Sequence, residues 1–309
     1  MPLSVRLCAV SVDLDEIPNY FQIHGLPPPT GPGSTAVYDI ALGRLEQMAA
    51  DASIPLTLFA VGSDLTRAHA AEGLSRAHDK GHEIANHTLG HRYDLTRQSR
   101  ETIRSEVVGG IEAIEKAVGE RPVGFRAPGY TITDTVFDVL VEVGVDYDSS
   151  VFPCPAYYGA KTAVIGGMSL FGRASRSIVD TPHVLRAPTR PYRVARPYWK
   201  KGKGLRELPI QVTRGLRLPF IGTNVTLAGV TGARWLARMC VDEPLINLEL
   251  HGIDVLDAHD GLGALRPYQQ DVRVTKEKKL AALHAVFELL KSEGYAFVTM
   301  REAAKAILD

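Results

Sequence analysis

Two histidines four positions apart, His87 and His91, are the first feature of this sequence that could do chemistry. On a helix this spacing places both imidazoles on one face, one turn apart. Such a pair commonly supplies two nitrogen ligands to a divalent metal ion. The chain contains ten histidines, so the spacing alone is a weak signal. A metal site needs a third ligand from another part of the chain.

Two aspartates, Asp13 and Asp15, directly follow the mostly apolar residues 5–12. Those residues predict a short buried strand, and a spacing of two places both carboxylates on one face. One carboxylate with two histidines is a common ligand set for a catalytic metal, with a position left for water. The second carboxylate can serve as general base toward that water. Alone, an Asp-x-Asp pair at a strand end more often forms a turn or a cap.

Helix-like and strand-like stretches alternate along the first half of the chain. Helices are predicted by apolar residues at helical spacing over 37–50, 65–80, 98–118 and 133–143. Strands are predicted by short apolar runs over 54–61, 83–86, 123–125 and 145–147. Such alternation is typical of parallel β/α units, whose active sites lie at the carboxyl ends of the strands. Polar motifs follow these strands, so the pattern predicts a β/α barrel.

The alternation of helix-like and strand-like stretches is lost between residues 152 and 231 and resumes afterwards. Helices are then predicted over 233–240, 275–292 and 300–308, and strands over 245–250 and 296–299. His251 directly follows one of these strands. It is therefore a candidate for the same site, with a core histidine as the alternative.

The irregular part is strongly basic. From Lys161 to Arg217 there are thirteen basic residues against two acidic ones, and arginine outnumbers lysine nine to four. A solvated charged face is the usual explanation. Arginines mixed with proline and aromatic residues also suit contact with phosphate groups or an anionic membrane surface. No motif supports nucleic-acid binding, so nucleic acid is not an expected partner. Residues 205–212 could form a strand within this segment.

A second irregular stretch, residues 18–35, contains five prolines and three glycines and predicts a loop. A long loop beside a strand end is often a lid or a substrate wall, with a disordered insertion as the alternative. We expect a single domain over residues 1–309 that carries this loop insertion and a basic insertion at about 152–231.

Composition predicts a soluble globular protein, with 45% hydrophobic residues and equal numbers of basic and acidic side chains. Three widely spaced cysteines argue against a disulfide framework and fit a reducing compartment. We see no signal-peptide pattern and no window near the roughly 20 apolar residues of a membrane span. These features predict a cytoplasmic location and say nothing of the oligomeric state.

Five motifs, in order along the chain, resemble those of the polysaccharide deacetylases, the NodB-homology group or carbohydrate esterase family 4. They are Asp13-x-Asp15, His87-Thr88-Leu89-Gly90-His91, Arg126-Ala127-Pro128-Gly129-Tyr130, Asp148 and Leu248-Glu249-Leu250-His251. The resemblance covers roughly residues 3–150 and 243–300. It implies a distorted (β/α) barrel of about seven parallel strands and metal-dependent hydrolysis of an N-acyl group, usually from an amino sugar.

By this resemblance, Asp15, His87 and His91 bind one divalent metal ion. Zinc is the ion we expect first, and cobalt, nickel and iron also accept this ligand set. Asp13 is then the general base. Arg126 orients Asp13 through a salt bridge, a use that suits a planar guanidinium.

The same resemblance makes His251 the general acid toward the leaving amine, with Asp148 holding it in the useful tautomer. A backbone N–H near Tyr130, together with the metal, would stabilise the oxyanion. Amide hydrolysis needs an activated water, an oxyanion stabiliser and an acid for a poor leaving group. The assignments agree with those needs.

The chain departs from the family pattern in three motifs. Leu14 separates the two aspartates, which are usually adjacent, and Gly129 intervenes between proline and tyrosine in the third motif. The fourth motif lacks its usual tryptophan. The spaced aspartates are similar to intracellular and lipid-linked-sugar branches of the family, including the deformylase of the aminoarabinose–undecaprenyl phosphate pathway.

The predicted function is removal of an acetyl or formyl group from an amino sugar or glycan. An anionic or lipid-linked substrate, and peripheral contact with the inner membrane face, are further hypotheses. Two alternatives stay open: hydrolysis of a small non-sugar amide, as in allantoinase-like relatives, and a catalytically silent carbohydrate-binding member. Asp13 and His251 argue against silence, because binding alone needs neither a base nor an acid.

Overall fold

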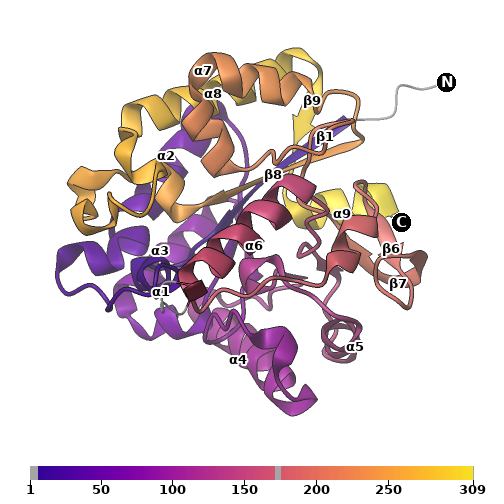
Figure 1. Cartoon of the computed structure of the whole chain (residues 1–309). Coiled ribbons are helices and arrows are strands. Elements are labelled where there is room, and N and C mark those ends of the chain that lie inside the picture. Colours follow the sequence, from indigo (N-terminus) through magenta and orange to yellow (C-terminus); the bar gives the residue numbers. More distant parts are fainter. Residues whose placement is uncertain (1–5, 171–174, 309) are drawn as a thin grey trace.

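A computed structural model describes residues 6–170 and 175–308. Its centre is a curled sheet with the strand order β6-β7-β5-β4-β3-β2-β1-β8, and β9 pairs with the start of β1 (Figure 1). The strands are β1 (Arg6–Asp13), β2 (Thr57–Ala60), β3 (Glu83–Asn86), β4 (Gly124–Phe125), β5 (Tyr147–Asp148), β6 (Tyr192–Val194), β7 (Lys201–Glu207), β8 (Leu245–His251) and β9 (Tyr295–Phe297). The seven strands from β7 to β8 are parallel, whereas β6 is antiparallel to β7.

The two ends of this parallel run are joined by an extended segment after β7. Leu208 donates its N–H to the carbonyl of Asp148 on β5, and Gln211 donates to the carbonyl of Asn247 on β8. The segment therefore fills the gap where a regular barrel would have another strand. The predicted fold class, a distorted β/α barrel with about seven parallel strands, is confirmed.

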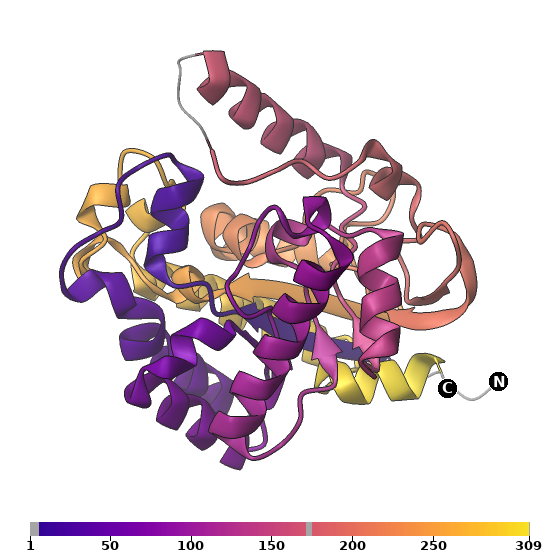
Figure 2. The ribbon, with the colours of Figure 1, turned by 90° about the horizontal axis from the view of Figure 1, so that it is seen from below.

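Helices surround the sheet (Figures 1 and 2). They are α1 (Ile17–Ile23), α2 (Leu42–Ala52), α3 (Ala68–Asp79), α4 (Arg100–Val118), α5 (Asp134–Glu142), α6 (Pro155–Leu170), α7 (Gly222–Arg238), α8 (Lys276–Ser292) and α9 (Met300–Leu308). Capping residues explain where helix α4 begins and ends. Ser99 caps α4 by accepting the N–H of Thr102, and Gly119 ends that helix with a φ of 83°.

β1 is the strand that fixes the position of the site. Every residue of β1 after Arg6 is buried, because β2 and β8 flank it and helices cover the sheet. A continuous apolar run is typical of a strand buried on both faces. Its carboxyl end, which carries Asp13, is therefore held inside the barrel.

The two predicted insertions are more ordered than expected. The first residues of the segment 18–35 belong to α1. This helix forms because Glu16 accepts the N–H of Ile17 and because Pro18 is tolerated in the first turn. The basic segment supplies α6, β6, β7 and the start of α7. Since β7 belongs to the parallel run, this segment is part of the barrel. The strand predicted over 205–212 overlaps only the end of β7.

Helix α6 stands at one edge of the molecule, away from the sheet (Figure 2). Among the described residues, no helix has the length and apolar character needed to cross a membrane.

Candidate active site and metal centre

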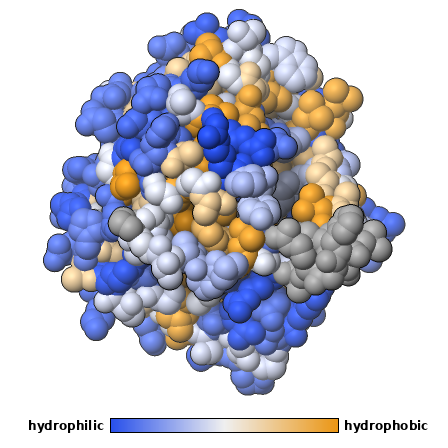
Figure 3. Space-filling model, turned by 60° about the vertical axis from the view of Figure 1, so that its left-hand side comes forward, coloured by the Kyte–Doolittle hydropathy of each residue, from blue (hydrophilic) through white to orange (hydrophobic). Residues whose placement is uncertain are grey.

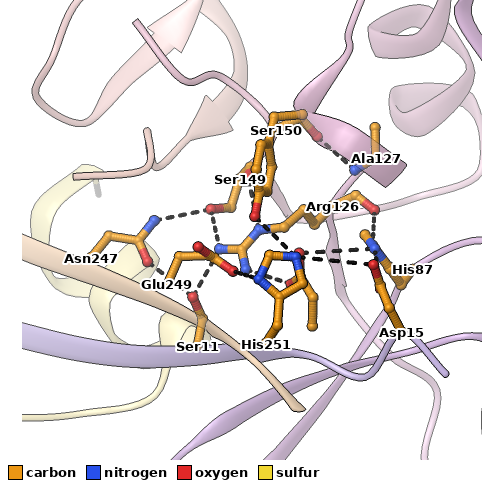
Figure 4. A network of polar contacts seen from close by, with 12 residues as sticks. Ser11, Asp15, His87, Arg126, Ala127, Ser149, Ser150, Asn247, Glu249 and His251 are labelled. Carbon is orange, nitrogen blue, oxygen red and sulfur yellow. Dashed lines mark hydrogen bonds and ion pairs between the residues drawn. The ribbon is translucent and has the colours of Figure 1, made fainter. Parts of the chain in front are cut away.

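The carboxyl ends of β1, β3, β4 and β8 bring the candidate side chains together (Figure 4). Asp13 and His251 are directly opposite each other in the β1–β8 register. Asp15 lies two residues past β1, His87 directly follows β3, and Arg126 directly follows β4. These side chains are buried, except that His251 is partly exposed.

Asp15, His87 and His91 meet at one point. Asp15 Oδ1 lies 3.2 Å from His87 Nε2 and 3.0 Å from His91 Nε2. The three atoms are buried, and no hydrogen-bond partner is found for them within residues 6–170 and 175–308. Buried polar atoms are normally satisfied, so converging unpartnered ligand atoms fit a metal ion with an open fourth position.

The tautomer of His87 agrees with a ligand role. His87 Nδ1 lies 2.7 Å from the carbonyl oxygen of Arg126, which can only accept a hydrogen bond. Nδ1 therefore carries the proton and Nε2 presents its lone pair toward Asp15, a common arrangement behind metal-binding histidines. Burial raises the pKa of Asp15, but the two histidines lower it well below its usual range.

The two histidines lie on a turn, which corrects the helix suggested by their spacing. The turn follows β3, with Thr88 at a φ of 69° and His91 at a φ of 51°. Asn86 Oδ1 accepts the N–H of Thr88 at 3.0 Å, and Thr88 Oγ1 accepts the N–H of His91 at 3.0 Å. The imidazole centroids are 5.0 Å apart. Hydrogen bonds from two side chains therefore stabilise a left-handed turn, which the four-residue spacing of the histidines did not predict.

Asp13 contacts Arg126 as expected. Arg126 Nη1 donates to Asp13 Oδ1 at 2.7 Å, and both side chains are inaccessible to solvent. Asp13 Oδ2 lies 3.8 Å from His87 Nε2, so it faces the ligand cluster. The geometry suits a carboxylate that accepts a proton from a water molecule there.

Glu249 takes the position that Asp148 was expected to occupy. Glu249 Oε1 lies 2.9 Å from His251 Nδ1, and His251 Nε2 points back toward Asp15 Oδ2 at 4.0 Å. Burial lowers the pKa of His251, but the Glu249 carboxylate raises it well above its usual value. His251 is thus held as a proton donor at neutral pH.

The placement of Asp148 beside His251 was therefore wrong. Asp148 accepts hydrogen bonds from the hydroxyl and the backbone N–H of Ser150, and it is opposite Glu207 in the β5–β7 register. Ser150 Oγ in turn accepts the N–H of Ala127. Asp148 therefore supports the third motif through Ser150 and does not contact His251.

The backbone N–H of Tyr130 is also not where the oxyanion assignment needs it. It donates to the carbonyl of Ala127 at 3.2 Å within a short turn, and Tyr130 has a φ of 57°. The inserted Gly129, with a φ of 66°, permits this turn. The hydroxyl of Tyr130 lies 3.3 Å from His251 Nε2 instead.

Glu249 is the site residue that the sequence analysis missed. Strand period places residues 249 and 251 on one face of β8, and this signal could have found it. Asp254 caps the turn after β8 by accepting the N–H of His251 at 2.8 Å.

A cavity of about 330 Å³ opens onto Asp15 and His251. Helix α1 contributes Tyr20 to its wall, and α6 contributes Tyr157, Val164 and other apolar residues. On the face shown in Figure 3, apolar residues gather near the middle, and hydrophilic residues surround them. The apolar wall suits a substrate with an apolar part.

Most charges of the basic segment are directed away from this cavity. Arg190 pairs with Glu243 at 2.6 Å, and Arg217 donates to the carbonyl of Leu185 at 2.9 Å. Of the basic side chains that the structure describes in this segment, Lys161 lines the cavity. Its burial lowers its pKa to about 8.

Comparisons with known proteins agree with the site. Residues 41–147 match the sequence profile of the polysaccharide deacetylase family. A peptidoglycan-N-acetylglucosamine deacetylase of Bacillus cereus is 33% identical over 129 residues, which cover 42% of this chain and 56% of that protein. The chain thus spans little more than half the length of this curated relative.

Solved structures show the same fold. A protein assigned to the polysaccharide deacetylases from Mycobacterium smegmatis matches with a TM-score of 0.52 and 20% identity, covering 97% of this chain and 95% of that one. The Xyl-CE4 domain of a multidomain xylanase from the hindgut metagenome of Trinervitermes trinervoides matches with a TM-score of 0.50 and 17% identity, over 97% and 90% of the two chains. The profile match over residues 41–147 and the curated relative support the expected resemblance to NodB-like polysaccharide deacetylases, and the solved structures show the same fold.

Proposed function

We propose that this protein is a metal-dependent N-deacylase that removes an acetyl or formyl group from an amino sugar. One divalent ion, with zinc the first choice, would be held by Asp15, His87 and His91. The observation that carries the proposal is that three unpartnered ligand atoms face Asp13 on one side and His251 on the other. The Bacillus cereus relative, named as a deacetylase of N-acetylglucosamine in peptidoglycan, supports this class of reaction.

The side chains divide the proton transfers between them. When bound, the ion would polarise the amide carbonyl and lower the pKa of a water molecule. Asp13 takes a proton as the water oxygen bonds to the carbonyl carbon, and the C=O π electrons move to the carbonyl oxygen. The C=O bond then re-forms while C–N breaks, and His251 protonates the departing nitrogen. The acyl group leaves as a carboxylic acid, and solvent returns the proton from Asp13 to His251.

The cavity supports an amino sugar that is bonded to an apolar group. Its walls are largely aliphatic and aromatic, and Lys161 offers one cation that could face a phosphate. A lipid-linked amino sugar combines these features. We include in this proposal a location in the cytoplasm or at the inner membrane face, where such substrates occur.

The same cavity also favours a second candidate, hydrolysis of a small non-sugar amide. A cavity of about 330 Å³ with largely apolar walls accommodates a small amide without any glycan contact. Both candidates use the same metal and proton-transfer groups, so only the substrate separates them.

Release of acetate and of formate from a panel of N-acylated compounds tests the proposal. The panel holds free, nucleotide-linked and polyprenyl-phosphate-linked amino sugars together with small cyclic and linear amides, each with wild type and Asp13→Asn. We expect release from a linked sugar with wild type only. Release from small amides alone would favour the second candidate. Metal binding without any release would point to a silent binding protein.

A further inference from the structure

The third motif leaves the site without its expected backbone donor. The N–H of Tyr130 is bonded to Ala127, and the carbonyl of Gly129 accepts Lys161 Nζ at 2.8 Å. The negative charge that develops on an amide oxygen during hydrolysis needs a preorganised donor, which is usually among the largest contributions to catalysis. Beside the ion, this hydrogen bond is left to a side chain.

The hydroxyl of Tyr93 is free to do so. The Tyr93 side chain is only 7% exposed, and its hydroxyl has no hydrogen-bond partner among the residues that the structure describes. It lines the cavity together with Asp15 and His251. A buried phenol that borders a substrate cavity and has no partner is costly unless a ligand satisfies it.

The position of the Tyr93 ring is fixed on the metal side of the site. The ring packs edge-on against His91, with centroids 4.8 Å apart. A Cβ atom at Gly129 would lie 3.1 Å from Tyr93 Cδ1. The inserted glycine thus removes the backbone donor and also leaves the space that the Tyr93 ring occupies.

The other candidate donors are less well placed. The hydroxyl of Tyr130 lies within hydrogen-bond distance of His251 Nε2, and Lys161 Nζ donates a hydrogen bond to the carbonyl of Gly129. Tyr20 has an unpartnered hydroxyl, but its ring neighbours His251, with centroids 6.3 Å apart, on the side of the leaving amine.

We propose that Tyr93 is a catalytic residue whose hydroxyl donates a hydrogen bond to the amide oxygen as negative charge develops on it. The phenol O–H is a hydrogen-bond donor, so it can donate to the amide oxygen throughout the reaction. The inference rests on the proposed deacylase function. In this chain a side-chain hydroxyl takes the role of oxyanion donor, which the family resemblance gives to a backbone N–H.

Three tyrosine-to-phenylalanine variants test this inference. Tyr93→Phe removes the proposed donor, and Tyr20→Phe removes the other unpartnered hydroxyl of the cavity. Tyr38→Phe is the matched control, because its hydroxyl is also buried and unpartnered but does not line the cavity. We expect kcat to fall by about 10²–10³-fold in Tyr93→Phe alone, with little change in KM.

Affinity for a tetrahedral phosphonate analogue of the substrate gives a readout independent of turnover. It should weaken in Tyr93→Phe by the same factor as kcat, whereas affinity for the product amine and the bound metal content should stay at wild-type values. Unchanged kcat and unchanged analogue affinity in Tyr93→Phe would overturn the inference, as would loss of metal. Absence of wild-type turnover on any amide would refute the deacylase function instead, and the analogue would then decide the role of Tyr93 alone.

Discussion

Arg126 connects the reactive groups at the scale of single residues. Its guanidinium is fully buried and donates to Asp13, Ser11 and Ser149, and it lies 4.2 Å from the ring centroid of Phe59. A buried cation is costly unless its donors are paired. Here pairing satisfies the cation and at the same time fixes the Asp13 carboxylate that would accept a proton.

Asp13→Asn should reduce turnover by about 10²–10⁴-fold, because an amide cannot accept the proton of water. Metal content should stay close to wild type, since Asp13 is outside the proposed ligand set. Measured kcat together with metal content by atomic absorption checks both points. Asp15→Asn is the control and should lose metal. Turnover by Asp13→Asn at the wild-type rate would remove Asp13 from the role of base.

Glu249→Gln should narrow the pH range of activity. Since Glu249 raises the pKa of His251 in the folded protein, the protonated acid persists to higher pH in wild type. Without the carboxylate, burial lowers this pKa, so the alkaline limb of kcat moves to lower pH and kcat at pH 8 falls by about tenfold or more. A pH–rate profile measures this. Asp148→Asn should leave the alkaline limb in place, and the reverse result would restore Asp148 to the role.

At the scale of elements, α4 holds the turn that carries His87 and His91. Asn86 Nδ2 donates to the carbonyl of Val107 on α4, and Gly90 donates its N–H to Glu106 at 2.8 Å. A Cβ atom at Gly110 would lie 2.2 Å from Asn86 Oδ1. The helix therefore approaches the turn closely only because residue 110 is a glycine.

Gly110→Ala should weaken metal binding and lower stability by about 1–3 kcal/mol, because the added methyl group displaces Asn86 and the turn it holds. Gly43→Ala is the matched control on α2, where an added Cβ meets nothing within 4 Å. It should be neutral or stabilising by up to about 1 kcal/mol from helix propensity. Denaturant unfolding and metal titration measure the two effects. Equal behaviour of the two variants would contradict this account.

At the scale of the whole molecule, two buried carboxyl groups link stability to pH. Burial and the neighbouring Asp148 raise the pKa of Glu207 well above its usual value. Glu207 therefore keeps its proton in the folded protein, and its contribution to stability is present at low pH and lost as pH rises through the folded pKa. In Glu207→Gln this loss cannot occur. The difference in free energy of unfolding between variant and wild type should shift in favour of the variant from pH 5 to pH 9. A difference that is independent of pH would refute this.

Metal removal should also lower the stability of the entire barrel. A ligand that binds only the folded state stabilises it by about 2.7 kcal/mol at a hundredfold excess over its dissociation constant. Chelation should therefore lower the melting temperature by several degrees, and added zinc should restore it. His91→Ala should show neither change. A melting temperature that is insensitive to chelator would argue against the metal centre.

The sequence by itself determined features that depend on local order. The alternation of helix-like and strand-like stretches led to a parallel β/α barrel, and the order of the motifs led to the resemblance to the polysaccharide deacetylases, which implied about seven strands. The apolar run before Asp13 and Asp15 placed Asp13 at the end of β1 and Asp15 two residues past it. Period and order are properties of the chain, so they can be read without knowing which strands are neighbours.

Only the tertiary structure decided which side chains meet. His87 and His91 lie on a turn because hydrogen bonds from Asn86 and Thr88 stabilise a left-handed backbone that a spacing of four does not require. Glu249 reaches His251 because both are on β8, whereas Asp148 is on β5 next to β7. Strand neighbours and register come from packing over the whole barrel, which no single stretch of sequence encodes.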